Sequence, residues 1–410
     1  MGDLFTVYDG RVPREADLVT YWHEKARAQI SEGRTRRAGL LATQGIRGGA
    51  NRKVLERIAE TGGIFFARSD DAWVLAGANV HISFVGQDDG RETERELDGQ
   101  PMATINADLS AGLDLTTARR LCENLGIAFI GDSKGGPFEI DADTAQAMLA
   151  SPNPDARSNA AVVRRWANGL DVGGRPRSMW IVDFGGERDQ QAAALFEAPF
   201  EYVRARVRPR RVADDSRTTR SEWWLHERPR PELRAATRGL ARIAVTIRHS
   251  KHRLWAWVPA ATLPDSALVA IAREDDYTFG VLHSRAHELW ARGTGTQLRE
   301  VESGFRYTPT TCFETFPFPR PTAEQREAIA AAAQRLVELR DGWLNPPGPD
   351  PAALAVRTLT NLYNQRPTWL ANAHDALDVA VLAAYGWRFD LANPDILERL
   401  LDLNLEREPA

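Results

Sequence analysis

Residues 38–67 read AGLLATQGIRGGANRKVLERIAETGGIFFA, and this stretch decides the fold class. It begins with a short apolar run, which is typical of a buried strand. A glycine-rich loop then leads into a segment where Val54, Leu55 and Ile58 recur at helical spacing. A glycine pair turns the chain into a second short apolar run. A strand, a helix and another strand in succession predict an α/β domain.

The flanking segments extend this pattern over residues 1–90. Leu18, Trp22, Ala26 and Ile30 recur every four residues, which predicts an amphipathic helix with one apolar stripe. The expected elements are two helices and three strands, at 18–33, 38–43, 50–61, 64–67 and 80–85. This series is short for a doubly wound domain, whose sheet normally has about five or more strands.

The pattern changes beyond residue 90. Residues 91–150 are mixed and are expected to form a connecting segment. Residues 151–321 carry many short apolar runs with aromatic side chains, which predict an irregular α+β domain. Residues 322–410 are expected to form a helical tail, with a long helix at 323–343 and a proline-rich linker after it.

Length and composition exclude several classes of protein. The chain has 410 residues, of which 43% are apolar and 26% charged, as in globular proteins of two or three domains. It contains no apolar run of the roughly 18 residues that a transmembrane helix needs, and its first residues do not resemble a signal peptide. Cys122 and Cys312 are too few for a disulfide framework or a zinc site. We therefore expect a reduced, cytoplasmic protein without a metal site.

The charge distribution singles out one segment. The whole chain carries −4, but residues 204–253 hold 15 basic and 5 acidic residues, so this segment carries +10 and the rest −14. A concentrated basic stretch in an acidic protein indicates a polyanionic partner. Only 4 of the 52 basic residues are lysines, however, and such a bias also arises from a GC-rich genome. Nucleic acid is favoured over a merely solvated surface, and RNA remains an alternative to DNA.

Several familiar site motifs are missing from the chain. There is no glycine-rich dinucleotide loop, no P-loop lysine and no paired-cysteine or H-E-x-x-H metal motif. Asn345-Pro346-Pro347 matches the start of the N-P-P-aromatic tetrapeptide of amino-methyltransferases, but Gly348 follows it. Its setting between two helices favours a linker.

Short motifs spread over nearly the whole chain carry a family resemblance. They are ADLVTYW (16–22), AGLLAT (38–43), RGGANR (47–52), WANGLD (166–171), WIVDFG (180–185), EAPFEYV (197–203), SKHR (250–253), GFRYT (304–308), FETFPFP (313–319), LD (377–378) and AYGW (384–387). Together they resemble the C-terminal portion of a class I, SAM-dependent DNA adenine-N6 methyltransferase of the large restriction–modification and phage-defence type.

The resemblance implies a fold and a function. The fold would be a partial class I methyltransferase (Rossmann-like) α/β sheet, followed by an α+β target recognition domain and a helical tail. In that family the SAM glycine loop and the N-P-P-aromatic motif precede the Asp17 region, so this chain would lack both. We expect it to bind double-stranded DNA, to work with an upstream segment or second chain carrying the SAM-binding half, and to be inactive alone. The alternative is a non-catalytic DNA-specificity subunit.

The same resemblance points to individual residues. Asp17, Leu18 and Tyr21 match a segment that lies near the SAM adenine, although Leu18 and Trp22 would equally suit a helix core. Trp73 is expected in the loop before the strand at 80–85, where related enzymes stack an aromatic ring on a flipped base, or it caps the sheet. The expected DNA contacts are Arg47, Lys134, Arg248, Lys251, His252, Arg253, Arg306 and Tyr307. For each of these, an ordinary surface residue is the competing interpretation.

Overall fold

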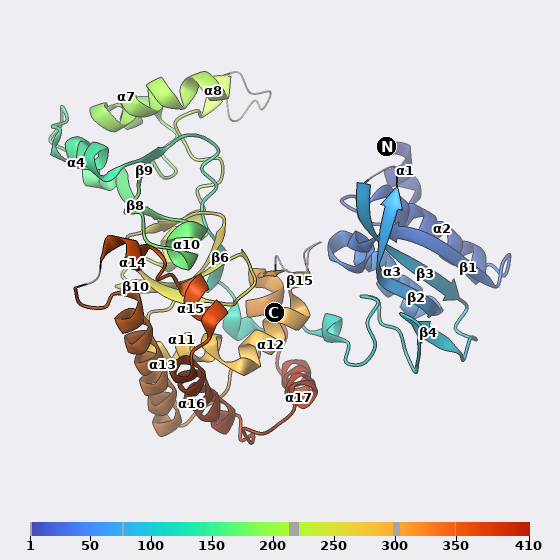
Figure 1. Cartoon of the computed structure of the whole chain (residues 1–410). Helices are drawn as coiled ribbons and strands as arrows, with labels where there is room; N and C mark the ends of the chain where they lie inside the picture. The colour runs from blue at the N-terminus through green and yellow to red at the C-terminus, as the bar shows by residue number, and fades with distance from the viewer. Residues whose placement is uncertain (1, 76–77, 213–220, 298–303, 349) are drawn as a thin grey trace. The chain divides into compact units, whose positions relative to one another are not determined.

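The computed structural model describes residues 2–75, 78–212, 221–297, 304–348 and 350–410. The chain folds into two compact units (Figure 1). The first comprises Met1–Ala118 and Thr296–Val301, and the second Arg119–Gly295 and Glu302–Ala410. The expected divisions at residues 90, 150 and 321 are finer than this partition and stay a prediction. No helix in the described part of the chain is long and apolar enough to cross a membrane.

The first unit is a mixed sheet covered by helices. Its main elements are α1 (Gly2–Val7), α2 (Leu18–Ser31), β1 (Arg37–Thr43), the 3-10 turn η1 (Gln44–Arg47), α3 (Gly49–Thr61), β2 (Gly63–Leu75), β3 (Ala78–Asp88), β4 (Arg95–Leu97) and β5 (Gln100–Met102). The strand order is β1-β3-β2-β4-β5, in which only β2 and β4 run parallel. The expected α/β class of residues 1–90 is therefore confirmed, and β2 with β3 forms one long antiparallel hairpin.

Strand β2 corrects one local expectation. It continues well past residue 67, because a register shift between Arg68 and Asp71 lets the hairpin carry on pairing to its tip. Trp73 thus lies within the strand, opposite Val80, and not in a loop. Its ring is 45% exposed and meets Phe84 edge-on at 6.1 Å between centroids.

Helix α2 corrects a second expectation, which concerns the face that it buries. It spans the expected residues, but Leu18 and Trp22 are 56% and 61% exposed, so the expected apolar stripe is wrong. The buried face consists of Thr20, Tyr21, His23, Glu24 and Ile30. This polar face can be buried because Arg27 and Arg57 reach the Glu24 carboxylate at 2.7 and 3.5 Å. Burial also lowers the pKa of His23 to about 4, which keeps its ring neutral.

Two four-stranded sheets form the centre of the second unit. The first has the order β12-β10-β14-β6 and is antiparallel throughout, with β6 (Ala128–Ile130), β10 (Arg242–Ile247), β12 (Trp255–Pro259) and β14 (Leu268–Ile271). The second has the order β13-β8-β9-β7, with β7 (Glu139–Ile140), β8 (Val163–Ala167), β9 (Trp180–Val182) and β13 (Leu263–Pro264). A two-residue ladder joins β11 (His249–Ser250) to β16 (Phe305–Arg306).

Helices surround these sheets. Before β10 they are α4 (Ala142–Ala150), α5 (Gly169–Gly173), α6 (Gln190–Ala194), α7 (Glu197–Arg206), α8 (Arg208–Val212) and α10 (Pro231–Ala236). After β14 they are α11 (Asp276–His283), α12 (Arg285–Thr294), α13 (Ala323–Leu344), α14 (Pro351–Ala355), α15 (Leu359–Gln365), α16 (Thr368–Ala384) and α17 (Asn393–Glu406). Within this unit, Figure 1 shows α7 and α8 at one end and the long helices α13 and α16 at the other.

Trp223 and Trp224 illustrate the core of the second unit. Both are at most 5% exposed and pack with Phe200 beneath α7, so they serve the core rather than a surface. Cys122 is exposed and Cys312 is buried, and both are free thiols. The long helix expected at 323–343 is α13, and the residues after it form the linker into α14.

Candidate nucleic-acid interface

Most of the predicted DNA-contacting residues lie where strand β10 ends, on the segments at 248–253 and 306–307. The Arg248 backbone follows β10, donating its N–H to Ala267 O at 2.8 Å and accepting from Tyr307 N–H at 2.8 Å. The chain then enters β11, which pairs with β16 through His249 and Arg306. Gly304 permits this approach, because its φ is +80° and an added Cβ would lie 2.1 Å from Ser250 O.

Three cations occupy this ladder and its ends: Arg248, Lys251 and Arg306. We call them the β11–β16 corner. Lys251 is exposed, and the two arginines are half-buried. Within the described part of the chain none of the three forms an ion pair, and the Nε atoms of both arginines are buried without a hydrogen-bond partner. Guanidinium groups without a protein partner can donate hydrogen bonds to phosphate oxygens and to guanine edges.

Arg253 supports this corner from below. Its side chain is buried, and it donates to Ile247 O at 2.5 Å and to Thr246 Oγ1 at 3.1 Å. The guanidinium carbon lies 4.4 Å from the centroid of the Phe305 ring and 4.9 Å from that of Tyr307. Burial lowers the pKa of Arg253 to about 10, so it stays charged at neutral pH. Because the side chain is buried and its two terminal nitrogens are bonded inside the protein, Arg253 stabilises the loop and does not face a ligand.

Tyr307 is likewise internal. It is fully buried, and its hydroxyl lies 3.0 Å from His287 Nε2. His287 Nδ1 faces Leu282 O at 3.0 Å, so Nδ1 carries the proton and Nε2 accepts from the tyrosine. Burial lowers the pKa of His287 to about 3, in agreement with a neutral ring. Arg253 and Tyr307 are therefore the scaffold of the corner, contrary to their expected role as DNA contacts.

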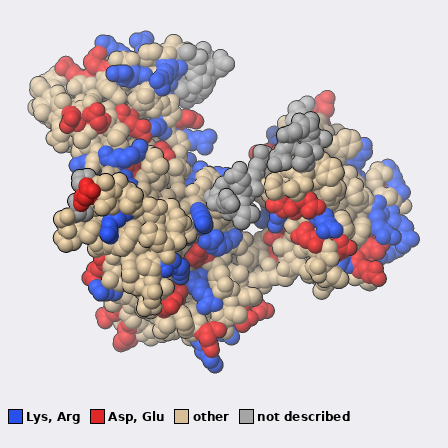
Figure 2. All heavy atoms as spheres, viewed as in Figure 1, with Lys and Arg blue, Asp and Glu red and all other residues tan. Residues whose placement is uncertain are grey.

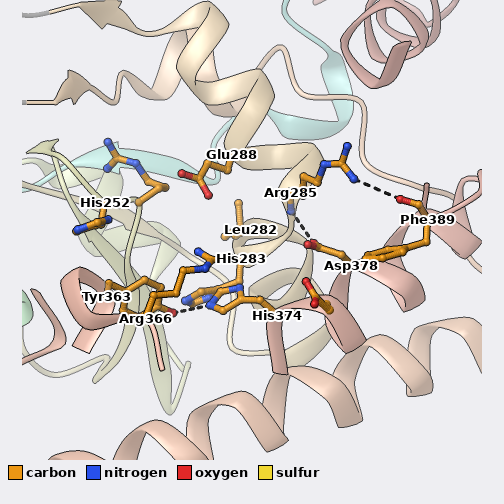
Figure 3. Close-up of a pocket in the computed structure, with 12 residues that line it drawn as sticks. His252, Leu282, His283, Arg285, Glu288, Tyr363, Arg366, His374, Asp378 and Phe389 are labelled. Atoms are coloured by element: carbon orange, nitrogen blue, oxygen red, sulfur yellow. Dashed lines mark hydrogen bonds between the residues drawn. The ribbon is translucent and has the colours of Figure 1, made fainter. Parts of the chain in front are cut away.

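His252 points from the corner toward a cavity of about 200 Å³ (Figure 3). Its Nε2 donates to Asn364 Oδ1 at 2.8 Å. Across the cavity, Tyr363 and His374 share a hydrogen bond of 2.8 Å. The cavity is thus bordered by His252 and Arg253 and by residues of α11, α12, α15 and α16, so helices of the C-terminal region lie next to the predicted DNA-binding loop.

Burial shifts the pKa values of three groups that line this cavity. Burial, together with the charge of Arg340, lowers the pKa of His374 to about 3 and that of His283 well below its usual value. Burial instead raises the pKa of Asp378 to about 7, only partly offset by the N–H of Arg285, which donates to its Oδ1 at 2.7 Å. These contacts tie α12 to α16, and nothing in the sequence spacing indicates them.

Lys134 is engaged rather than free. Its Nζ lies 2.6 Å from Glu139 Oε1, which also accepts from Trp166 Nε1 at 2.8 Å. The ammonium lies 5.8 Å from the Trp166 ring centroid. To contact a phosphate, Lys134 would have to leave both partners, which weakens the prediction made for it.

A buried charge cluster next to Lys134 was not predicted. Asp132, Asp183 and His226 bring their ligand atoms within 4.8 Å of one another, a spacing that a metal ion could use. The Arg234 guanidinium occupies this space instead, because it bonds both carboxylates. Its Nη1 lies 2.5 Å from Asp183 Oδ2. Burial alone would raise the pKa of Asp183, but the charges of His226 and Arg234 outweigh it and lower the value to about 2. Asp132 and Asp183 lie 51 positions apart and Asp183 and His226 lie 43 apart, so no local pattern reveals the cluster.

In the first unit, the expected cofactor residues hold the backbone together. Asp17 and Asn51 exchange two hydrogen bonds, of 2.7 and 2.8 Å, and Asn51 also donates to Gly45 O at 3.1 Å. Tyr21 is buried against Tyr8, with ring centroids 5.2 Å apart. Asp17 and Leu18 are exposed, whereas Tyr21 is buried. These residues alone do not make up a complete SAM site.

Arg47 lies at the end of η1, after strand β1. Its Nε donates to Asp108 O at 2.9 Å, and the side chain is half-buried. One face of the guanidinium is therefore fixed while the remaining nitrogens make no hydrogen bond among the described residues. Arg47 remains a predicted phosphate contact of the first unit, and Trp73 an exposed aromatic on the hairpin.

Comparisons with known proteins agree with this arrangement. Residues 140–320 match the family described as "MmeI, target recognition domain". Over 149 residues the chain is 29% identical to DNA methyltransferase A of Bacillus subtilis (strain 168), covering 36% of this chain and 15% of that protein. The fold matches that of the Type IIL restriction-modification enzyme MmeI, solved in complex with DNA, with a TM-score of 0.75 and 20% identity.

That structural match covers 99% of this chain and 54% of the MmeI chain, so the present chain spans about half the length of its structural relative. The matched family range contains the β11–β16 corner and the strands of both sheets, except β6 and the first residue of β7. Residues 140–320 are therefore similar to the target recognition domain of MmeI, and a further comparison places part of the chain near a DNA methyltransferase.

Proposed function

We propose that this chain recognises the target site of a DNA adenine-N6 methyltransferase in a restriction–modification or phage-defence system. The observation that carries the proposal is the β11–β16 corner, where three unpaired cations lie within the target recognition domain. Phosphate contacts position a protein on duplex DNA, whereas arginines reaching base edges specify the sequence. Arg248 and Arg306 are suited to reading bases, because buried backbone contacts hold their loops. Lys251 is suited to a phosphate.

The role of the first unit is also part of the proposal. We infer that its sheet is the end of a class I methyltransferase sheet and contributes to the wall of the catalytic pocket. Strand β1 supports this, since it pairs with β3 on one side and carries Leu41, which is 44% exposed. Leu18 and Trp22 add exposed apolar surface on α2. A SAM-binding half, supplied by an upstream segment or a second chain, would cover this surface, with Trp73 near the flipped adenine. A cytoplasmic location belongs to the same proposal.

Selection from a randomised duplex DNA library tests target recognition. The wild-type chain should enrich one short sequence, and the variant Arg248→Ala/Arg306→Ala should bind duplex DNA without that preference, because removal of a bidentate arginine costs about 1 to 3 kcal/mol of discrimination. Arg335→Ala/Arg388→Ala removes the same charge from two exposed tail arginines and serves as the control. Failure of the wild type to enrich any duplex, or preferential binding of RNA, would refute the proposal.

Titration with labelled SAM separates the two forms of the function. A methyltransferase polypeptide that needs a partner should bind SAM only after the SAM-binding half is added. A non-catalytic specificity subunit should keep its DNA preference and never acquire SAM binding. The hydrogen bonds between Asp17 and Asn51, and the packing of Tyr21 against Tyr8, favour weak or absent SAM binding by the chain alone. Micromolar binding by the isolated chain would contradict the expectation that it lacks the cofactor loop.

A further inference from the structure

A second basic surface lies on α7 and α8, apart from the β11–β16 corner. Residues 204–212 read RARVRPRRV, and Arg206, Arg208 and Arg210 are all exposed. We call these three the α7–α8 patch. Figure 2 shows Lys and Arg side chains gathered over the end of the second unit where Figure 1 places these helices. Neighbouring Arg204 is also exposed but is paired with Glu201.

The patch is unpaired but firmly anchored. Among the described residues, Arg206, Arg208 and Arg210 form no ion pair. Val203 and Val207 are fully buried in the core under α7. Arg211 is buried as well and donates to Lys134 O at 2.7 Å and to Leu225 O at 2.5 Å. Arg208 lies over the Trp223 ring at 5.6 Å from its centroid. The cations are therefore displayed on a fixed backbone.

The chemistry of the segment points to phosphate and not to base edges. Residues 204–212 contain no Asn, Gln, Ser or Thr, so arginine supplies all of its polar side chains. Closely spaced arginines without a polar neighbour provide charge for a polyanion but no pattern of donors and acceptors. Its charge is concentrated on two short consecutive helices.

We propose that the α7–α8 patch contacts the phosphate backbone of duplex DNA independently of sequence, as a second anchor in addition to the β11–β16 corner. This inference rests on the proposed DNA-recognition function. It divides the work of the domain: the corner supplies sequence preference, and the patch supplies affinity that depends on salt. The basic segment at 204–253 then contributes to two separate binding surfaces. Other arginines of the segment, such as Arg211, Arg234 and Arg253, bond groups inside the protein.

The salt dependence of binding tests the patch. The full chain is titrated with a fluorescent 30-base-pair duplex of random sequence at NaCl concentrations from 50 to 200 mM. Arg206→Ser/Arg208→Ser/Arg210→Ser should lower the slope of log Kobs against log salt by about 0.9 for each phosphate that the variant no longer neutralises. If three phosphates are released in this way, the fall in affinity over this range shrinks by about 40-fold. The lysine variant, Arg206→Lys/Arg208→Lys/Arg210→Lys, should keep the wild-type slope of log Kobs against log salt, because lysine still binds phosphate as a point charge.

Two controls make the outcome decisive. Arg320→Ser/Arg335→Ser/Arg388→Ser removes the same charge from three exposed positions outside α7 and α8 and should leave the slope unchanged. Circular dichroism establishes that each variant is folded, and the lysine variant remains informative if the serine variant is not. An unchanged slope in the folded serine variant overturns the patch. Loss of binding in the lysine variant also overturns it, since that result indicates base reading. A wild type that binds no duplex at all refutes the proposed function instead.

Discussion

Replacing Asp378 by asparagine should stabilise the protein, and increasingly so as the pH rises. Burial raises the pKa of this carboxyl from 3.8 to about 7, with small contributions from the charges of Asp375 and Glu288. The folded protein therefore holds the proton more tightly than the unfolded chain does. An acid with a raised pKa in the folded state costs stability as the pH climbs from the unfolded value to the folded one.

The size of the effect follows from the pKa. One pKa unit corresponds to about 1.4 kcal/mol, so a rise from 3.8 to about 7 means that full ionisation costs the folded state roughly 4 kcal/mol. About 2 to 3 kcal/mol of that cost develops between pH 5 and pH 8. Asparagine carries no charge, and its Oδ1 can still accept the N–H of Arg285, which now bonds Asp378 at 2.7 Å.

Urea unfolding at pH 5 and pH 8 measures this difference. The gain in unfolding free energy of Asp378→Asn over wild type should be larger at pH 8 than at pH 5 by about 2 to 3 kcal/mol. Asp402→Asn makes the same chemical change at an exposed position of α17 and should show no such trend. A gain that is equal at the two pH values, or a loss at pH 8, would refute the assignment of a buried, protonated carboxyl.

Four further substitutions test other parts of the structure. Arg234→Met should lower the unfolding free energy by about 3 to 5 kcal/mol, because it leaves two buried carboxylates without their partner; urea unfolding measures this. Trp22→Ser should change stability by less than about 0.5 kcal/mol, whereas Tyr21→Ala should cost about 3 to 5 kcal/mol, and thermal unfolding distinguishes an exposed ring from a buried one. Tyr307→Phe should cost about 1 to 2 kcal/mol while leaving the affinity for duplex DNA unchanged; weaker binding by the folded variant would show that this hydroxyl reaches the DNA.

Local signals in the sequence predicted local structure well. Strand β1 and helix α3 begin and end within one residue of the expected ranges, since an apolar run and glycines at both ends of the helix define them. The expected face of α2 failed for a reason that spacing cannot reveal. Glu24 is buried because Arg57, 33 residues away, reaches it, so the helix turns a polar face inward and leaves Trp22 exposed.

The predicted interface shows the same limit at the level of single residues. Lys251 and Arg253 are two positions apart in one basic loop, and the sequence treats them alike. Arg253 is internal because the rings of Phe305 and Tyr307, about 50 residues further along the chain, pack against its guanidinium group. The family resemblance identified the loop and its chemistry, whereas the division into exposed contacts and buried supports depends on these long-range contacts.

The scaffold beneath the corner has a consequence for how such a protein changes over time. Buried side chains hold the backbone of β11 and β16, while Arg248, Lys251 and Arg306 form no ion pair with the described residues around them. Exchanging the three side chains would therefore alter what the surface reads at little cost to folding. Related proteins could therefore change their preferred DNA site at these three positions and keep the same core. The residues that can vary are neighbours of the residues that hold the loop.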